Sequence, residues 1–256
     1  MIDFYRFSHL SACPTLAHAV STKSKTFPYH FSLALHTNEE KQSIIQNRTL
    51  LANAFDTSHD LDFVLAHQTH SDHIHIVKQK RSQGWEDLDD AIQDCDALIT
   101  DIPHIALCIL TADCVPILLY DTKKKVIAAI HAGWKGTQSE IAYKTVRKMQ
   151  QHYGSNPKDI LAGIAPSIGK CCYEVDQNVA QHFFHIPKSS TPIGDKYMLD
   201  LPYINQTQLL RAGVQKRHIK MSHICTACEV EQFFSYRKEH GCSGRFMSII
   251  SLLPKP

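Results

Sequence analysis

Six short apolar runs constrain the fold of this chain more than any other sequence feature. They are rich in β-branched residues and nearly continuous, whereas a strand with one face in water would alternate apolar and polar side chains. The runs are Leu61–Ala66, Ile105–Leu110, Val115–Tyr120, Val126–Ile130, Ile160–Ile164 and Phe246–Leu252. This pattern is typical of strands that are buried on both faces of their sheet.

Helical patterns alternate with these runs. Residues 41–55, 176–185 and 202–212 are expected to be helices, and the last has Pro202 near its start and Gly213 just past its end. The residues Thr137-Gln-Ser-Glu140 match a capping box, which predicts a helix that begins there. Four residues of that helix would lie on one face, as in an amphipathic helix. These are Ile141, Thr145, Met149 and Tyr153.

A charged turn lies between two of the apolar runs and predicts how they pair. Lys123-Lys124-Lys125 joins Val115–Tyr120 to Val126–Ile130, and three charges are too few for a phosphate or membrane patch. The two runs therefore predict a hairpin, which requires antiparallel pairing and argues against a purely parallel doubly wound sheet. We expect an α+β fold with a mixed β-sheet core and flanking helices.

Composition and charge describe an ordinary globular chain. The 256 residues are 43% apolar and 20% charged, which favours one domain spanning residues 1–256. A net charge of +2 gives no indication of nucleic-acid binding, and the sequence contains no apolar run long enough to cross a membrane. The N-terminus lacks a signal-peptide pattern, so we expect a cytoplasmic protein. The nine cysteines, spread from Cys13 to Cys242, are then expected to be thiols.

Three candidate ligands follow or end apolar runs. His70 follows Leu61–Ala66, Cys114 lies between two runs, and His131 follows Val126–Ile130. Two imidazoles and a thiolate suit zinc with one coordination position left open, and copper accepts the same ligands. The three residues are too far apart in sequence to form a local metal motif, and a histidine at a strand end is usually just hydrogen-bonded.

Other histidines and cysteines are explained by packing or exposure. His73 and His75 alternate with isoleucines and are expected on the polar face of a strand. Cys225-x-x-Cys228 is a lone pair without a second one, which favours chance or core packing over zinc. The adjacent Cys171 and Cys172 could not both point into one pocket from an extended strand. Neither a GxGxxG nor a GxxxxGK[ST] motif occurs, so the common dinucleotide and P-loop sites are excluded.

The Gly133-Trp-Lys-Gly136 segment ahead of a predicted helix has two interpretations. Backbone N–H groups, the helix dipole and Lys135 would favour a phosphate. An ordinary tight turn with an exposed lysine explains the same residues equally well. Trp134 is then either a hydrophobic plug or a surface on which a base stacks.

Several motifs taken together resemble a known family. They are Gln68-x-His70, Asp96-Ala-Leu-Ile-Thr100, Ala112-Asp-Cys-Val-Pro116, His131-Ala-Gly-Trp-Lys-Gly136, Ala165-Pro-Ser-Ile-Gly169, Cys172-Tyr-Glu-Val175, Ser235-Tyr-Arg237 and Gly244-Arg245. In this order they resemble the laccase-like multicopper polyphenol oxidoreductases, a family now regarded as broad-specificity purine nucleoside phosphorylases. The resemblance covers roughly residues 18–250. This chain departs from the family pattern in Lys23-Ser-Lys25, where the family has glycines, and in Lys135, where it has arginine.

The resemblance implies a fold, a site and a reaction. The fold would be cysteine-hydrolase-like, and His70, Cys114 and His131 would bind the metal, zinc or copper, and act as the catalytic residues. The reaction would be phosphorolysis of adenosine, inosine and methylthioadenosine, with adenosine deaminase activity. The implied partners are purine nucleosides and phosphate, with no nucleic acid or membrane, and a homodimer is compatible with the family. The residues expected to bind substrate are Arg48, Gln68, Lys135 and Arg237.

Three alternatives remain open from the residues themselves. A copper-dependent polyphenol oxidase would need more clustered histidines for a four-copper centre than the sequence offers. A cysteine hydrolase would use Cys114 as nucleophile and His131 as its base, in competition with metal binding. If a fourth protein ligand closes the metal shell, the zinc would be structural and the chain a binding module.

Overall fold

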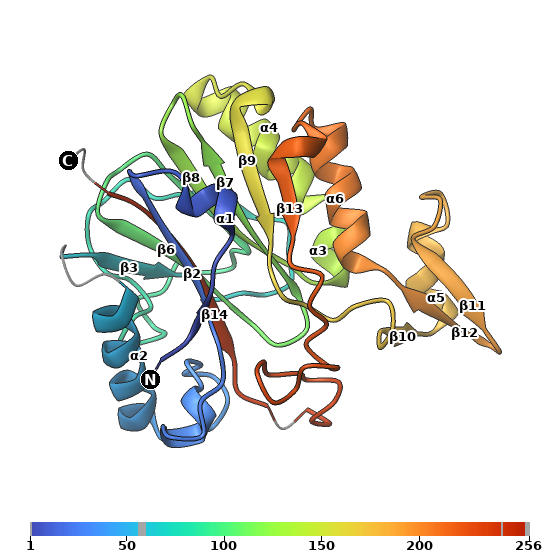
Figure 1. The fold of residues 1–256 in the computed structure, drawn as a ribbon, viewed down its shortest axis with the longest axis horizontal. Coiled ribbons are helices and arrows are strands. Elements are labelled where there is room, and N and C mark those ends of the chain that lie inside the picture. The colour runs from blue at the N-terminus through green and yellow to red at the C-terminus, as the bar shows by residue number, and fades with distance from the viewer. Residues whose placement is uncertain (1, 56–59, 242, 254–256) are drawn as a thin grey trace.

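The structure is a computed structural model that describes residues 2–55, 60–241 and 243–253. Cys242 lies outside the described residues. Within them, the strands form sheets of five, six and three strands (Figure 1). The first sheet has the order β1 (Phe4–Tyr5), β2 (Leu16–Ser21), β14 (Phe246–Leu252), β6 (Ile105–Thr111) and β3 (Asp62–Leu65). The second has the order β13 (Ile219–Met221), β9 (Ile160–Ile164), β7 (Val115–Asp121), β8 (Val126–Ala132), β5 (Ala97–Thr100) and β4 (Ile74–Ile76).

The two larger sheets pack face to face, which explains the nearly continuous apolar runs. Side chains from both sheets, among them Leu107, Leu118 and Phe246, form one buried cluster between them. Helix α2 (Lys41–Phe55) covers the outer face of the five-stranded sheet. Helices α4 (Ile141–Tyr153) and α6 (Leu201–Arg211) cover the outer face of the six-stranded sheet. Each central strand therefore has an apolar neighbour on both faces, and all six predicted runs form strands.

Pairing within the sheets is mixed, as the hairpin predicts. Strands β7 and β8 are antiparallel and joined by the exposed lysine turn, whereas β3 and β6, β4 and β5, and β9 and β13 are parallel pairs. The α+β fold with a mixed-sheet core and flanking helices is confirmed. The third sheet, of β10 (Glu174–Val175), β12 (Lys196–Leu199) and β11 (Ser190–Ile193), projects to one side (Figure 1).

The predicted helices are confirmed at residues 41–55 and 202–212, and two predictions need correction. The capping box is wrong, because Thr137 lies inside the short helix α3 (Trp134–Gln138) and Glu140 adopts a left-handed backbone before α4 begins. The helical turn already begins at Trp134, so Thr137 is not at a helix start and does not cap one. Its Oγ1 instead accepts a bond from Asn205 in α6 at 3.0 Å. Residues 176–185 form only the short α5 (Gln177–Ala180) followed by a 3₁₀ turn (Gln181–Phe183).

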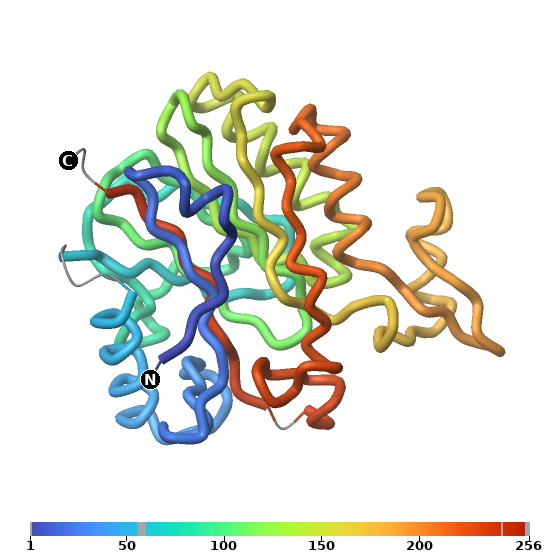
Figure 2. Tube along the Cα trace, viewed as in Figure 1, coloured from blue at the N-terminus to red at the C-terminus, as the bar shows by residue number. Residues whose placement is uncertain are grey.

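The remaining elements are short. They are α1 (Ser8–Ser11) and 3₁₀ turns at Pro28–Phe31, Pro157–Asp159 and Lys216–His218. Two loops far apart in sequence are hydrogen-bonded to each other, since Lys23 N–H donates to the Gln232 carbonyl at 2.7 Å and Leu33 N–H to the Arg245 carbonyl at 3.0 Å. Figure 2 traces both loops at the lower end of the molecule. Over the described ranges, none of the helices has the length and apolar character needed to span a bilayer.

Candidate active site

The three predicted ligands meet where three strands end. His70 follows β3, Cys114 lies in the turn from β6 to β7, and His131 belongs to β8. Their ligand atoms all lie within 4.8 Å of one another, and Cys114 Sγ is 3.7 Å from His70 Nε2. The imidazole rings of His70 and His131 stand edge to face at 4.7 Å. The structure therefore brings together all three residues that the sequence singled out.

The turn that carries Cys114 crosses from one large sheet to the other. Asp113 makes this turn with a left-handed backbone at φ 82°. Its carboxylate accepts hydrogen bonds from Thr226 Oγ1 and from the Arg237 N–H, both at 2.7 Å. Because a left-handed residue other than glycine costs energy, these buried bonds hold Asp113, and with it Cys114, in place. Asp113 was not among the residues predicted for the site.

Asp96 positions both histidines, and the sequence reasoning missed this role. Its buried carboxylate accepts from His131 Nδ1 at 2.6 Å, from the His70 N–H at 3.1 Å, and from the N–H and hydroxyl of Ser71 at 2.7 Å each. The bond to Nδ1 leaves Nε2 of His131 as the ring atom available to a ligand. A carboxylate that directs a histidine in this way is the usual partner of a metal-binding imidazole. The sequence signal that could indicate this role is the position of Asp96, an acidic residue directly before the buried strand β5 (Ala97–Thr100).

The site holds strongly shifted titrating groups. Burial alone raises the pKa of the Cys114 thiol, but the charge and hydrogen bonding of His131 and His70 outweigh it and lower this pKa to about 6. Burial alone lowers the pKa of His131, but the Cys114 thiolate and the Asp96 carboxylate raise it to about 9. Burial likewise acts to raise the pKa of Asp96, yet the bond and charge of His131 lower it to about 2. Without a metal, Cys114 and His131 thus favour a thiolate–imidazolium pair at neutral pH.

A cavity of about 570 Å³ opens onto the three ligands. Its walls combine aromatic, cationic and further polar side chains. They include Gln68, Trp134, Tyr173, Tyr236, Arg237 and Arg245. A more open depression of about 680 Å³ beside β4 contains none of the predicted site residues. The smaller cavity is therefore the candidate for substrate binding.

Two of the four predicted substrate-binding residues line this cavity. Arg237 does so, with Nη1 bonded to the Glu174 carbonyl at 2.7 Å. Gln68 also lines it, and its amide accepts a bond from the Leu110 N–H at 2.9 Å and donates one to the Leu110 carbonyl at 2.8 Å. Gln68 therefore fixes the loop that carries His70 to the end of β6. Arg245 is a cation at the cavity that the prediction missed.

Arg48 and Lys135, the other two residues predicted to bind substrate, lie away from the cavity. The Arg48 side chain is completely buried, and its guanidinium donates to the carbonyls of Leu33, Gly84 and Trp85 at 2.9, 2.7 and 2.5 Å. Lys135 is exposed on α3, with its Nζ 5.7 Å from the Trp134 ring, and neither residue lines the cavity. Arg48 serves the packing of α2 against two loops.

The structure also places the histidines and cysteines that the sequence explains by exposure or packing. His73 and His75 are exposed, as the alternation predicts. The premise that Cys225-x-x-Cys228 has no second pair is wrong, because the sulfurs of Cys225 and Cys228 form one group with those of Cys171 and Cys172. The last two residues lie in a turn, not in a strand, so both sulfurs can face the same point. The sequence signal for this group is the CxxC spacing of Cys225 and Cys228, together with the adjacent pair Cys171 and Cys172.

His70, Cys114 and His131 form a donor set that fits a metal ion. Two imidazole nitrogens and one thiolate match zinc, and also copper. In the part of the chain that the structure describes, this group holds three residues of metal-binding type and not four. A three-ligand set leaves one position for water or substrate, which argues against the structural-zinc alternative at this site.

We predict that Gly133→Ala weakens metal binding at least tenfold, the usual scale for residues that orient ligands. A Cβ atom at position 133 would lie 2.7 Å from His70 Cδ2 and 3.1 Å from Cys114 Sγ, so one ligand must move. Zinc titration against a competing chelator measures the change. Gly194→Ala in the turn between β11 and β12 is the control for backbone strain without a ligand contact, because Gly194 has a left-handed backbone at φ 58° and a Cβ atom there would meet nothing within 4 Å. Unchanged zinc affinity in Gly133→Ala would contradict the contact.

We predict that Cys114 of the metal-free protein reacts with iodoacetamide with a midpoint near pH 6, because the thiolate is the reacting form. Below this pH the thiol is protonated and the rate should fall about tenfold per pH unit. Cys13 is the internal control, since burial raises the pKa of its thiol. Mass spectrometry of the alkylated peptides gives both profiles. A Cys114 midpoint near that of Cys13 would contradict the thiolate–imidazolium pair.

The fold and the cavity together define a class: mixed α+β proteins with a two-histidine, one-cysteine site between strand ends. A family model described as "Multi-copper polyphenol oxidoreductase laccase" matches residues 16–253. The chain belongs to this family, as the ordered motifs indicate.

Named relatives extend this finding. "Purine nucleoside phosphorylase YlmD" of Bacillus subtilis is 35% identical over 225 residues, which cover 85% of this chain and 80% of the relative. "Adenosine deaminase RL5" from an unknown prokaryotic organism is 32% identical over 221 residues, or 84% of each chain. The crystal structure of YlmD from Geobacillus stearothermophilus superposes with a TM-score of 0.90 at 29% identity, covering 99% of this chain and 100% of that one.

Proposed function

We propose that this chain is a purine nucleoside phosphorylase that acts on adenosine, inosine and methylthioadenosine and also deaminates adenosine. One observation carries the proposal: His70, Cys114 and His131 converge on a cavity that two arginines and three aromatic side chains line. The names of the relatives, purine nucleoside phosphorylase and adenosine deaminase, supply the substrate class.

Phosphorolysis places clear demands on the cavity. The bond from ribose C1′ to the base nitrogen breaks, a phosphate oxygen bonds to C1′, and a proton passes from phosphate to the departing base. Positive charge develops on the ribose, so phosphate must be held close to C1′ by preorganised donors. Arg237 and Arg245 are the cations of the cavity that we assign to phosphate.

Aromatic side chains provide a surface for the purine. Tyr173, Trp134 and Tyr236 line the same cavity as the two arginines. Arg237 Cζ lies 5.3 Å from the Tyr173 ring centre, and Arg245 Cζ lies 5.8 Å from that of Tyr236. Each ring therefore stands beside a cation, and we propose that the base stacks on one ring while phosphate contacts the neighbouring guanidinium.

The second activity depends on the three ligands. A zinc ion held by His70, Cys114 and His131 would lower the pKa of a water molecule that replaces the amino group at C6. The protein's own contribution is orientation, because Asp96 fixes the ring of His131 and the backbone of His70. We propose zinc as the ion, with copper as the alternative that the same donors accept.

We predict that Cys114→Ala abolishes phosphate-dependent release of adenine from adenosine and of hypoxanthine from inosine. The change removes the thiolate ligand and leaves two donors, which cannot retain the ion. Chromatography of nucleosides incubated with and without phosphate separates phosphorolysis from deamination to inosine. Cys13→Ala, a cysteine away from the cavity, is the matched control and should keep full activity. Nucleosides left intact by zinc-loaded wild-type protein would contradict the proposed function.

A cysteine hydrolase is a second candidate, favoured by the pKa of Cys114 near 6 and that of His131 near 9. A thiolate bound to a metal is not a free nucleophile, so the two functions exclude each other. One equivalent of metal at this site in protein purified without added metal would argue against the hydrolase. A polyphenol oxidase with four coppers would need more histidines than the two that this described group contains.

Three expectations accompany the proposal: cytoplasmic location, a single domain spanning residues 1–256, and a homodimer. They are predictions from the sequence and the family. Sedimentation of the purified protein measures the oligomeric state directly.

A further inference from the structure

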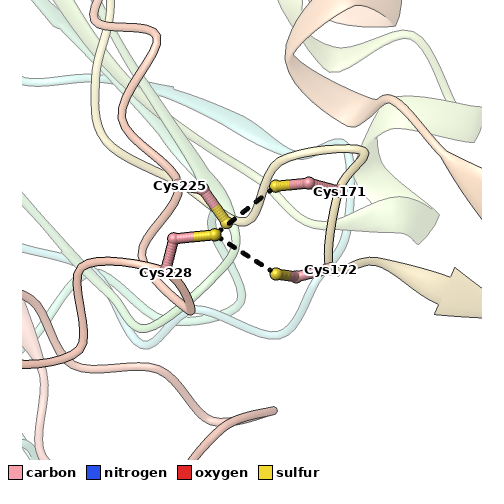
Figure 3. A group of neighbouring side chains, drawn as sticks. All are labelled: Cys171, Cys172, Cys225 and Cys228. Atoms are coloured by element: carbon pink, nitrogen blue, oxygen red, sulfur yellow. Dashed lines mark hydrogen bonds between the residues drawn. The ribbon is translucent and has the colours of Figure 1, made fainter.

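Four cysteines from two separate loops gather at one point outside the cavity. Cys171 and Cys172 lie in a turn after β9, and Cys225 and Cys228 lie in a turn after β13 (Figure 3). All four sulfur atoms lie within 4.8 Å of one another. Cys228 Sγ is 3.7 Å from Cys171 Sγ and 3.5 Å from Cys172 Sγ. None of these residues lines the cavity that holds His70, Cys114 and His131.

The spacing of the sulfurs fits an ion and not a bond. A disulfide would bring two sulfurs to roughly 2.05 Å, and these four cysteines are free. Four thiolates at the usual zinc–sulfur distance of about 2.3 Å stand roughly 3.8 Å apart along each edge of the tetrahedron. The observed 3.5 and 3.7 Å lie close to that edge length. Cys171 and Cys228 are exposed, which gives an ion a path into the group.

The backbone around the group supports a ligand role. The Gly169 N–H donates to Cys225 Sγ at 3.2 Å, the kind of bond that orients a thiolate and offsets its charge. A Cβ atom at Gly169 would lie 3.2 Å from Cys225 Cβ and 3.3 Å from Cys171 Sγ, so glycine allows the two loops to approach closely.

We propose that Cys171, Cys172, Cys225 and Cys228 bind a structural zinc ion, separate from the three-ligand site. Four thiolates close the coordination shell, so this ion has no position for substrate and acts as a cross-link. The inference does not depend on the proposed function, since the two sites share no residue.

The cross-link would join two walls of the cavity. Tyr173, next to Cys172, lines the cavity. Thr226, next to Cys225, donates its hydroxyl to Asp113 at 2.7 Å, and Asp113 also accepts from the Arg237 N–H. Backbone bonds also join the two loops beside the group: the Thr226 N–H donates to the Ser167 carbonyl at 3.1 Å and the Ser167 N–H to that of Ile224 at 3.3 Å. The zinc would therefore fix the position of both walls and add to the stability of the fold.

Metal counting with matched variants tests the proposal. Wild type, Cys114→Ala and the double variant Cys171→Ser/Cys228→Ser are purified under strong reductant, loaded with zinc, desalted and analysed by mass spectrometry for zinc and iron. We expect each variant to carry one equivalent of zinc fewer than wild type. Equal zinc in wild type and the double variant would overturn the proposal, as would stoichiometric iron in place of zinc. If Cys114→Ala alone retained all its zinc, the three-ligand site would fail while this inference stood.

A second measurement needs no variant and covers the case in which the double variant does not fold. Zinc-loaded and chelator-treated wild-type protein are alkylated with iodoacetamide, and the peptides are quantified by mass spectrometry. We expect zinc to protect all four cysteines at least tenfold, because bound thiolates are poor nucleophiles. Equal alkylation with and without zinc, or a disulfide among the four under reducing conditions, would overturn the proposal.

Discussion

Replacing Asp96 by asparagine should lower zinc affinity 10- to 100-fold and destabilise the fold by about 3 kcal/mol. The carboxylate is buried and accepts six bonds at 2.6–3.4 Å, from His131 Nδ1, the His70 N–H, and the N–H and hydroxyl groups of Ser71 and Thr69. An amide has one acceptor oxygen, so its NH₂ group would face donors that now bond to oxygen. His131 would lose the acceptor that fixes its ring, and the loop that carries His70 would lose its anchor.

Asp94→Asn is the matched control for this prediction. Asp94 lies two residues away, is exposed, and pairs with His73 at 2.9 Å and with the Thr69 hydroxyl. Exposed ion pairs contribute about 0–1 kcal/mol, so its loss should change neither zinc affinity nor stability much. Zinc titration and denaturant unfolding measure both quantities. If Asp96→Asn bound zinc as tightly as wild type, Asp96 would not direct the ligands.

Many of the strands can be predicted from local sequence, because a strand that is buried on both faces of its sheet appears as a nearly continuous apolar run. Strand β7 belongs to the six-stranded sheet. It packs against the five-stranded sheet with Leu118 and against α4 and α6 with Ile117 and Leu119, so it must be apolar throughout. The capping box failed for a different reason. Whether Thr137 caps a helix depends on where the chain begins to turn, and the close approach of Gly133 to His70 and Cys114 starts that turn earlier.

The site was harder to predict because its geometry is non-local. The strand ends that meet at the site depend on how the chain passes from β6 in one sheet to β7 in the other. The sequence spacing of His70, Cys114 and His131 does not indicate this passage. The strand ends single out the three residues, and the resemblance to a family supplies their joint role as one metal site. It could not separate Arg48, which packs, from Arg245, which lines the cavity. The sequence does not indicate that the four cysteines form one group, because the two pairs lie more than 50 residues apart. Only the turns after β9 and β13 bring the pairs together.

Arg48→Met should cost about 3 kcal/mol of stability, equivalent to roughly 6–12 °C in Tm, and leave phosphate binding unchanged. Methionine fills much of the volume, but the carbonyls of Leu33, Gly84 and Trp85 lose their donor. Each buried acceptor left without a donor costs about 1–3 kcal/mol. Removing a buried charge offsets part of this cost, since burial already disfavours the guanidinium and lowers the pKa of Arg48 to about 10.

Two further arginine variants serve as controls for the Arg48→Met prediction, one for stability and one for phosphate binding. Arg211→Met removes an exposed ion pair with Glu140 and should change stability by less than about 1 kcal/mol. Arg237→Met should raise the KM for phosphate and leave Tm nearly unchanged, because Arg237 is exposed at the cavity. Thermal unfolding and phosphate-dependent kinetics on the three variants separate packing from binding. A raised KM for phosphate in Arg48→Met with a wild-type Tm would contradict the structural role, and would return Arg48 to the binding site.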